Sequence, residues 1–327
     1  MSAFKVMTWN VENLFRPGGD SGPKTDEAFA KKLSSLAEVI LKLDPDVLAL
    51  QEVGGEAPLA DLADALEGRY SHSKLSEHPD RRGIRVGFLS KLAIELSDEV
   101  VTFPATGLPA VPGIDEKGSL VEATRMSRGA LRIVVKPTPD LSVHLIVGHL
   151  KSKLLSFPGR RFDTNDENER ARIAGIALLQ RTAESVALRV KANEILQQQP
   201  KDGLIVLGDL NDVTDAATTQ ILQGPSGSEI GTRGFNSPDK GDDARLFNLA
   251  PLIASERRFS RIHKGNPELI DHILISEQLL PGQPRRLPTV DSHVDLVGAL
   301  PSIGDDPKER QGKPSSDHAP VTAAFEL

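Results

Sequence analysis

The sequence of 327 residues contains no cysteine. This absence excludes disulfide bonds, a cysteine nucleophile and thiolate ligands for a metal. The sequence also lacks any run of about 18 uncharged apolar residues, so it predicts no membrane-spanning helix. No basic region followed by an apolar run begins the chain, and we expect no signal peptide. Together these absences predict a cytoplasmic protein.

An excess of positive charge is absent as well, because the net charge is −7 and the isoelectric point is ≈ 5.7. Tight binding to nucleic acid of any sequence requires lysines and arginines that neutralise phosphates, so this composition argues against it unless a local basic patch exists. With 39% hydrophobic and 26% charged residues, the composition is globular. No long linker divides the chain, and we predict a monomer with a single domain, 1–327.

Hydrophobic periodicity predicts strands that alternate with helices. Helices are expected at 26–43, 59–66, 168–199 and 215–222. Strands are expected at 4–9, 46–50, 70–74, 84–89, 92–103, 130–135, 143–147, 204–207, 259–263, 269–275 and 321–325. We interpret 84–89 and 92–103 as an antiparallel pair, and 104–127, 224–245 and 281–316 as long loops. Short strands with two long helices predict two sheets packed together, with the helices outside.

The most informative stretch is the apolar run 204–207, which is followed by Gly208, Asp209 and Asn211. Four apolar residues in succession predict a strand that is buried on both faces. Buried parallel strands carry ligand-binding groups at their C-terminal ends. Polar groups at such an end need water, a metal or a ligand, or they form a turn.

Similar polar groups accompany other predicted strands. The clusters are Asn10 with Asn13, Glu52, His149, Asp209 with Asn211, Asp271 with His272, and Ser316 with Asp317 and His318. One polar strand end is unremarkable, but carboxylates, amides and imidazoles at six ends predict that these ends converge on one site.

Six motifs at these positions resemble the endonuclease/exonuclease/phosphatase family, which includes deoxyribonuclease I and exonuclease III. They are TWNVENLF at 8–15, LALQEV at 48–53, GHLKSK at 148–153, VLGDLND at 206–212, IDHILIS at 270–276 and SDHAPV at 316–321. They follow the family's order and cover nearly the whole chain. The resemblance implies an α/β fold, a four-layer αββα sandwich of two mainly antiparallel sheets. It also implies phosphoester hydrolysis that depends on Mg²⁺ or Mn²⁺.

The resemblance implies oxygen ligands for this metal. Glu52 is the principal ligand, and Asn10 and Asp317 complete or support the metal shell. These residue types agree with the chemistry, because hard divalent cations take oxygen ligands, usually a few carboxylates with water and substrate phosphate.

Five further residues are implied to act on the substrate. His318, oriented by Asp271, serves as an acid/base or phosphate-binding imidazole, since a carboxylate partner raises a histidine's pKa and fixes its tautomer. Asp209 positions the attacking water. Asn211 and His149 donate to non-bridging phosphate oxygens, and His149 also stabilises the leaving oxygen. The reaction implied is an in-line attack on phosphorus.

One region departs from the deoxyribonuclease I pattern. In those enzymes the histidine corresponding to His149 pairs with an upstream glutamate, whereas residues 81–86 offer arginines and no carboxylate. The orienting partner of His149 therefore stays open, and Arg85 is a candidate to face the substrate phosphate. Exonuclease III-type members place a tyrosine in the role of His149, so we expect no close relationship to the abasic-site repair enzymes.

Four neighbours of these residues are expected to have structural roles. Asn13 belongs to a turn, and Trp9 packs in the core or at its rim. His272 holds structure through a hydrogen bond to a loop. Asp212 is a cap for the helix at 215–222 or a simple loop charge.

Two substrate classes remain open, and a non-enzymatic binding module is disfavoured because every expected catalytic position is filled. The motifs HLKSK and WNVENLF resemble the nuclease-like bacterial branch, which implies a nuclease or phosphodiesterase acting on nucleic acid. The acidic net charge favours the alternative, a phosphatase of a small phosphorylated molecule such as a sugar, inositol or lipid headgroup. The arrangement of six arginines distinguishes the two substrate classes. If these arginines cluster at the rim of the site they form a nucleic-acid groove, and if they are scattered a small substrate is favoured. They are Arg81, Arg82, Arg160, Arg161, Arg257 and Arg258.

Overall fold

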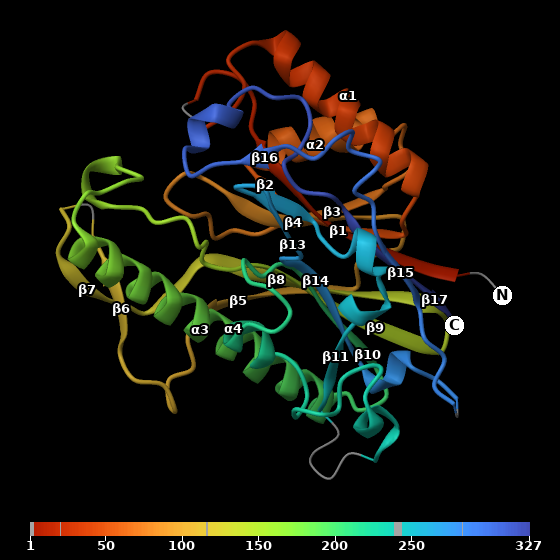
Figure 1. Ribbon diagram of the computed structural model, residues 1–327. Coiled ribbons are helices and arrows are strands. Elements are labelled where there is room, and N and C mark those ends of the chain that lie inside the picture. The colour runs from red at the N-terminus through yellow and green to blue at the C-terminus, as the bar shows by residue number, and fades with distance from the viewer. Residues whose placement is uncertain (1–2, 20, 116, 239–243, 283) are drawn as a thin grey trace.

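The chain folds into four layers, in the order helix, sheet, sheet, helix (Figure 1). The computed structural model describes residues 3–19, 21–115, 117–238, 244–282 and 284–327. Helices α1 and α2 cover the outer face of the first sheet, and α3 and α4 cover that of the second. This confirms the predicted αββα sandwich. The helices are α1 (Asp26–Leu43), α2 (Glu56–Ala65), α3 (Glu167–Gln198) and α4 (Ala217–Gln220). None of the helices in these ranges is both long and apolar enough to span a bilayer.

Each large sheet has six strands and is mainly antiparallel. In spatial order the first contains β15 (Thr289–Ser292), β17 (Val321–Glu326), β1 (Ala3–Leu14), β2 (Val47–Val53), β4 (Arg85–Ser90) and β3 (His72–Leu75). The second contains β11 (Leu246–Asn248), β14 (Asp271–Ser276), β10 (Gly203–Asp209), β9 (Leu141–His149), β8 (Arg125–Thr138) and β5 (Leu96–Thr102). The pairs β1–β2 and β9–β10 are parallel.

Shorter elements lie outside the two large sheets. A small sheet contains β13 (Asn266–Glu268), β12 (Arg261–His263) and β16 (Ser302–Ile303), and a hairpin contains β6 (Val111–Ile114) and β7 (Leu120–Ala123). Single 3₁₀ turns occur at Pro158–Arg160, Arg233–Asn236, Ala250–Leu252, Ser255–Arg257, Glu277–Leu279 and Pro307–Arg310.

Both faces of the central strands are buried, which explains their continuous apolar sequences. Successive side chains of a strand point to opposite faces of the sheet. In β2, Val47 and Ala49 pack between the sheets, whereas Leu48 and Leu50 pack beneath α1 and α2. The apolar side chains of β10 alternate in the same way between the inter-sheet core and the core beneath α3.

The first helix has the bounds that the sequence predicts. The hydroxyl oxygen of Thr25 accepts a hydrogen bond from the backbone N–H of Ala28, which caps one of the free donors of the first turn. At the other end, Asp44 adopts a left-handed conformation (φ 47°) just before Pro45. A residue before proline is disfavoured in the helical region, so the helix stops here.

The predicted antiparallel pair of 84–89 with 92–103 is wrong. β4 belongs to the first sheet, and β5 belongs to the second, where it pairs with β8. The alternating apolar residues Leu92 and Ile94 suggested a strand, but they pack against the core between the two sheets. The segment between β4 and β5 is therefore a crossover from one sheet to the other.

Two predicted loops contain further strands. The segment 104–127 forms the β6–β7 hairpin, although its residue 116 is outside the described part. The segment 281–316 contributes β15 to the edge of the first sheet and β16 to the small sheet, with residue 283 outside the described part. The third segment, 224–245, contains one 3₁₀ turn in its described residues, which exclude 239–243. The proline and glycine content of these segments concealed strands of two to four residues.

Candidate active site

Backbone irregularities in β1 and β2 place Asn10 and Glu52 side by side. Asn10 lies opposite Gln51 in the parallel pair, and the register shifts beyond this point. Glu12, Asn13 and Glu52 have positive φ angles of 50°, 53° and 66°. Bulges of this kind redirect side chains at functional sites. As a result, the amide nitrogen of Asn10 lies 3.4 Å from Glu52 Oε1, and the backbone N–H of Asn13 donates to Glu52 Oε2 at 2.9 Å.

A close approach of two backbones places His149 beside Asp209. The parallel register of β9 and β10 puts Gly148 opposite Gly208 and His149 opposite Asp209. Gly208 has a φ of +139°, and a Cβ atom added to it would lie 2.0 Å from the carbonyl oxygen of Gly148. Only glycine fits this position. The side chains that follow then meet, with 3.4 Å between His149 Nε2 and Asp209 Oδ2.

The neighbouring strand β14 brings Asp271 to the same edge, because Asp271 lies opposite Asp209. Asp271 Oδ2 lies 2.7 Å from His318 Nδ1 and accepts a hydrogen bond from the hydroxyl of Ser260, also at 2.7 Å. His318 Nε2 lies 4.0 Å from Asp209 Oδ2. The indole N–H of Trp9 donates to the carbonyl oxygen of His318 at 2.8 Å and fixes its backbone.

Asp209 joins the contributions of the two sheets. Its Oδ2 atom accepts a hydrogen bond from the amide of Asn10 at 3.0 Å, and its Oδ1 atom accepts one from the backbone N–H of Asn211 at 2.9 Å. The side-chain amide of Asn211 donates to the carbonyl oxygen of Leu150 at 2.9 Å. Of the eight predicted site residues, seven are therefore connected by contacts of 4.0 Å or less.

Burial and charge set the protonation of the central groups. Burial lowers the pKa of His318, but the charges of Asp271, Asp317 and Asp209 outweigh this effect and raise the pKa to about 10. Burial, followed by the charge of Asp271, raises the pKa of Asp209 to about 6. Burial and several nearby cations lower the pKa of His149 well below its usual range. At neutral pH the site thus contains a cationic His318 and a neutral His149.

The eighth residue, Asp317, is held by a carboxylate that sequence reasoning missed. Its backbone N–H donates to Glu12 Oε2 at 3.1 Å. Glu12 is buried and receives two hydrogen bonds from Arg310, of 3.1 and 2.8 Å. Burial, followed by the charge of Asp317, raises the pKa of Glu12 to about 7. The available signal was a charged residue inside the first motif, TWNVENLF.

Ser316 belongs to one of the predicted polar clusters, but the sequence indicated no role for it. Its hydroxyl donates to the carbonyl oxygen of Asn10 at 2.6 Å and accepts from the backbone N–H of His318 at 3.0 Å. Ser316 therefore ties the last motif to the first.

Two of the four structural roles expected for neighbouring residues are confirmed, and Asn13 lies within β1 and not in a turn. Trp9 is buried, and His272 Nε2 lies 2.9 Å from the carbonyl oxygen of Asp212, which is the expected bond to a loop.

Asp212 is neither the cap nor the simple loop charge expected of it. Helix α4 begins five residues later, and the buried Asp212 carboxylate pairs with Arg181 at 3.1 Å and accepts a hydrogen bond from the Thr218 hydroxyl at 2.8 Å. Arg85 donates to a backbone carbonyl, that of Gly54, at 3.4 Å.

The donor set fits a hard divalent cation. Among the described residues, the candidate ligand atoms of Asp209, Asp271 and His318 lie within 4.8 Å of one another, and the two carboxylates are the available ligands because His318 is protonated. Glu52 and Asn10 add carboxylate and amide oxygens beside them. The Oδ1 atom of Asp271 is buried and has no hydrogen-bond partner in the described part of the chain. Such an oxygen-rich group suits Mg²⁺ or Mn²⁺ better than a soft metal.

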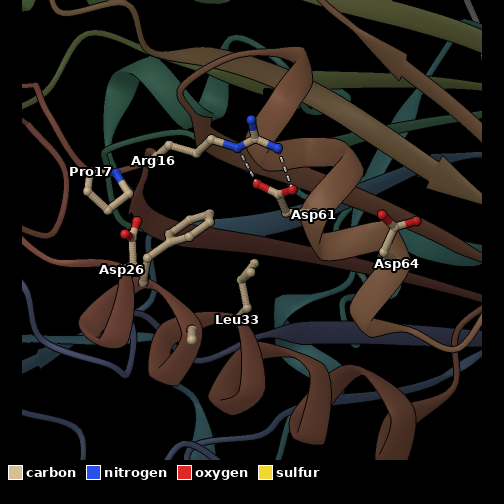
Figure 2. Close-up of a pocket in the computed structure, with 8 residues that line it drawn as sticks. Arg16, Pro17, Asp26, Leu33, Asp61 and Asp64 are labelled. Carbon is tan, nitrogen blue, oxygen red and sulfur yellow. Dashed lines mark hydrogen bonds and ion pairs between the residues drawn. The ribbon is translucent and has the colours of Figure 1, made fainter.

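A surface hollow of ≈ 510 Å³ lies elsewhere, between α1, α2 and the loop after β1 (Figure 2). The guanidinium group of Arg16 in this hollow is paired with Asp61 through two contacts of 2.6 Å. Its other charged side chains are the exposed carboxylates of Asp26 and Asp64. Because its cation is already neutralised, this hollow does not suit a phosphate group.

This sandwich, with carboxylates, amides and imidazoles gathered at one edge of both sheets, defines a phosphoester hydrolase. The model of the endonuclease/exonuclease/phosphatase family matches residues 7–318, and the chain belongs to this family. It is accordingly a metal-dependent enzyme, a nuclease or a phosphatase. No curated protein matches the chain.

Solved structures share the fold at low sequence identity. Truncated TDP2 of Caenorhabditis elegans is 17% identical, with a TM-score of 0.56 over 99% of this chain and 98% of that one. ANGEL2, described as a 2′,3′-cyclic phosphatase, is 14% identical, with a TM-score of 0.58 over 99% and 95%. The human Nocturnin catalytic domain with bound sulfate is 15% identical, with a TM-score of 0.53 over 99% and 94%.

Proposed function

We propose that this chain is a nuclease or phosphodiesterase that cleaves phosphodiester bonds by in-line attack of water. The observation that carries the proposal is the convergence of three groups on Asp209 Oδ2. They are the amide of Asn10 at 3.0 Å and the Nε2 atoms of His149 at 3.4 Å and His318 at 4.0 Å. An anionic oxygen surrounded by donors suits the positioning of a water beside a phosphate.

Each side chain has a defined part in this proposal. Asp209, whose pKa of about 6 leaves it ionised at neutral pH, accepts a hydrogen bond from the attacking water and its proton. The cationic His318, oriented by Asp271, donates from Nε2 to a non-bridging phosphate oxygen. Asn211 donates to another such oxygen. Neutral His149 donates from Nε2 and stabilises the leaving oxygen.

Glu52, Asn10 and Asp317 would hold Mg²⁺ or Mn²⁺. When bound, the metal offsets the negative charge that develops on the phosphoryl oxygens. We propose further that the protein is one domain over residues 1–327 and acts as a cytoplasmic monomer.

A phosphatase of a small phosphorylated molecule is the second candidate, and the scatter of the arginines that distinguish the two substrate classes supports it. Arg161 pairs with Glu169, and Arg257 pairs with Asp291. Arg81 and Arg258 donate to backbone carbonyl oxygens, and the side chain of Arg160 lies outside the described part of the chain. Arg82 lies 3.7 Å from Asp80 in its own loop. The five described arginines thus contact groups on separate elements, which does not support an extended nucleic-acid groove.

Hydrolysis assays with Mg²⁺ or Mn²⁺ and an EDTA control test the proposal. Bis-p-nitrophenyl phosphate, plasmid DNA and RNA represent diesters, and a panel of phosphomonoesters represents the alternative. We expect diester cleavage that EDTA abolishes, and phosphate release from monoesters alone would favour the phosphatase.

Variants connect this activity to the site. Glu52→Gln and His318→Ala are expected to abolish hydrolysis and to leave the far-ultraviolet circular dichroism spectrum unchanged. Matched controls are Glu56→Gln, an exposed carboxylate at the start of α2, and His72→Ala in the edge strand β3. Both controls should retain full activity. Near wild-type rates in Glu52→Gln or His318→Ala would refute the site assignment.

A further inference from the structure

A buried guanidinium group lies next to the proposed phosphate-binding residue Asn211. Arg128 is 7% exposed, and its Nη1 atom donates to the carbonyl oxygen of Leu150 at 3.2 Å. The same oxygen accepts the side-chain amide of Asn211 at 2.9 Å. One backbone carbonyl thus connects the two donors. Arg128 Nε donates to Asp80 at 3.1 Å, which fixes the orientation of the guanidinium plane.

Two more cations gather around this arginine, and their countercharge is incomplete. Arg82 Nε lies 3.7 Å from Asp80, so that one carboxylate faces two guanidinium groups. Lys151 follows the catalytic strand β9, and burial, followed by the charge of Arg128, lowers the pKa of its ammonium group to about 8. The charge of Glu184 opposes this lowering, but the Glu184 carboxylate accepts a hydrogen bond from the backbone N–H of Lys151.

His149 borders the same region. It is 2% exposed, and its Nδ1 atom has no hydrogen-bond partner among the described residues. The charges that act most strongly on this imidazole are those of Arg128 and Arg82, followed by His318 and Lys151.

Arg128 is buried and Lys151 is partly buried, whereas the side chain of Arg82 is 44% exposed. Burying cations without sufficient countercharge is unfavourable unless an anion joins them. Asp80 and Glu184 together give two carboxylates to the three cations Arg82, Arg128 and Lys151, which leaves one negative charge for the substrate to supply.

We propose that Arg82, Arg128 and Lys151 form a subsite for a second phosphate group, adjacent to the phosphate that is cleaved. The planar guanidinium of Arg128 matches phosphate oxygens through two donors, and Lys151 adds a point charge. This inference rests on the proposed phosphoester hydrolysis and specifies its substrate as one that carries two neighbouring phosphates. Recognition of a second phosphate beside the first needs no extended groove.

Pairs of substrates that differ by one phosphate test the subsite. The dinucleotide TpT and its 5′- and 3′-phosphorylated forms represent nucleic acid, and fructose 6-phosphate and fructose 1,6-bisphosphate represent small molecules. A charge-assisted contact at the subsite should raise kcat/KM for the form with the extra phosphate about tenfold or more. The pair that shows this preference identifies the source of the second phosphate. A preference in neither pair, with bis-p-nitrophenyl phosphate still hydrolysed, overturns the subsite and leaves the proposed function intact.

Variants assign the preference to the cations. Arg82→Gln and Lys151→Gln should each reduce the ratio of the two kcat/KM values toward one. The matched control is Lys153→Gln, two residues after Lys151, whose ammonium group is already paired with Asp212 at 3.1 Å and Glu268 at 3.7 Å. It should retain the wild-type ratio. An unchanged ratio in both test variants would contradict the assignment.

Binding without turnover provides a second readout. Calorimetry in EDTA would compare thymidine 3′,5′-bisphosphate with thymidine 5′-monophosphate. We expect the bisphosphate to bind about tenfold more tightly to the wild type, and the difference to disappear in Arg82→Gln and Lys151→Gln. Equal affinities of the wild type for the two nucleotides overturn the subsite, whether or not any substrate is hydrolysed. If the bisphosphate binds more tightly but no substrate is hydrolysed, only the proposed function is refuted.

Discussion

Replacing Gly208 with alanine is the most direct perturbation of the geometry that pairs His149 with Asp209. The new Cβ atom would lie 2.0 Å from the oxygen, 2.9 Å from the carbon and 3.0 Å from the nitrogen of Gly148. All three are backbone atoms, so no side-chain rotation relieves the contact. A φ of +139° also costs a residue other than glycine about 1–3 kcal/mol. Strands β9 and β10 must also separate to admit the Cβ atom. With this cost added to the backbone strain, we expect the free energy of unfolding to fall by about 3 kcal/mol or more.

Thermal unfolding and activity together measure this effect. In a chain of this size, 1 kcal/mol corresponds to about 2 °C, so Gly208→Ala should lower Tm by about 6 °C or more. A displacement of about 1 Å between His149 and Asp209 should lower kcat about 100-fold. A variant with the Tm and kcat of the wild type would refute the argument that this close approach positions the site.

The matched control is Gly175→Ala, in the exposed face of α3. An added Cβ atom has no neighbour within 4 Å there. Alanine is about 0.5–1 kcal/mol more favourable than glycine within a helix, so Tm should rise by about 1–2 °C with unchanged activity. Both substitutions replace glycine with alanine. Opposite changes in Tm would therefore show that the effect at Gly208 arises from the backbone contact.

Two further predictions concern buried charged or titratable groups. Burial lowers the pKa of His272, which lies between Asn248 and the carbonyl of Asp212. The unfolded chain therefore binds a proton that the folded chain does not, and stability falls below about pH 6.5 by at most about 1.4 kcal/mol per pH unit for this group. Urea unfolding of His272→Gln between about pH 7 and 5 should show a shallower slope, and an unchanged slope contradicts this. Arg310→Met leaves the buried Glu12 carboxylate without its ion-pair partner and should lower the free energy of unfolding by about 3–5 kcal/mol. The double variant with Glu12→Gln should recover part of this loss, whereas strict additivity in the urea experiment would exclude the coupling.

Local sequence signals predicted much of the fold. The bounds of α1 followed from its apolar spacing and from Asp44-Pro45. The buried strands followed from continuous apolar runs, and the polar residues at one end of each marked the site, because the C-terminal ends of the parallel strands β9 and β10 and the N-terminal end of the antiparallel strand β14 lie at the same edge of the sheet. Adjacent strand ends bring His149, Asp209 and Asp271 together, as the register of β9, β10 and β14 records.

The features that the sequence did not predict depend on distant contacts. The sheet to which β5 belongs is decided by its pairing with β8, and not by its own residues. The pairing of Glu12 with Arg310 joins residues that are 298 positions apart. Bulges were missed as well, because Asn10 and Glu52 lie inside β1 and β2, where pairing holds them, and not beyond the strand ends.

Contacts that cross between the sheets couple the reactive groups to the fold. Asn10 of the first sheet donates to Asp209 of the second, and His318, just before β17 of the first, pairs with Asp271 of the second. The oxygen ligands proposed for the metal therefore come from the first sheet, whereas Asp209, which is proposed to accept the proton of the attacking water, comes from the second. Their relative positions are set by the apolar core between the layers, which resists displacement because it is closely packed. Since these dipoles and charges are held before substrate binds, the rigid sandwich itself supplies the preorganisation on which electrostatic catalysis depends.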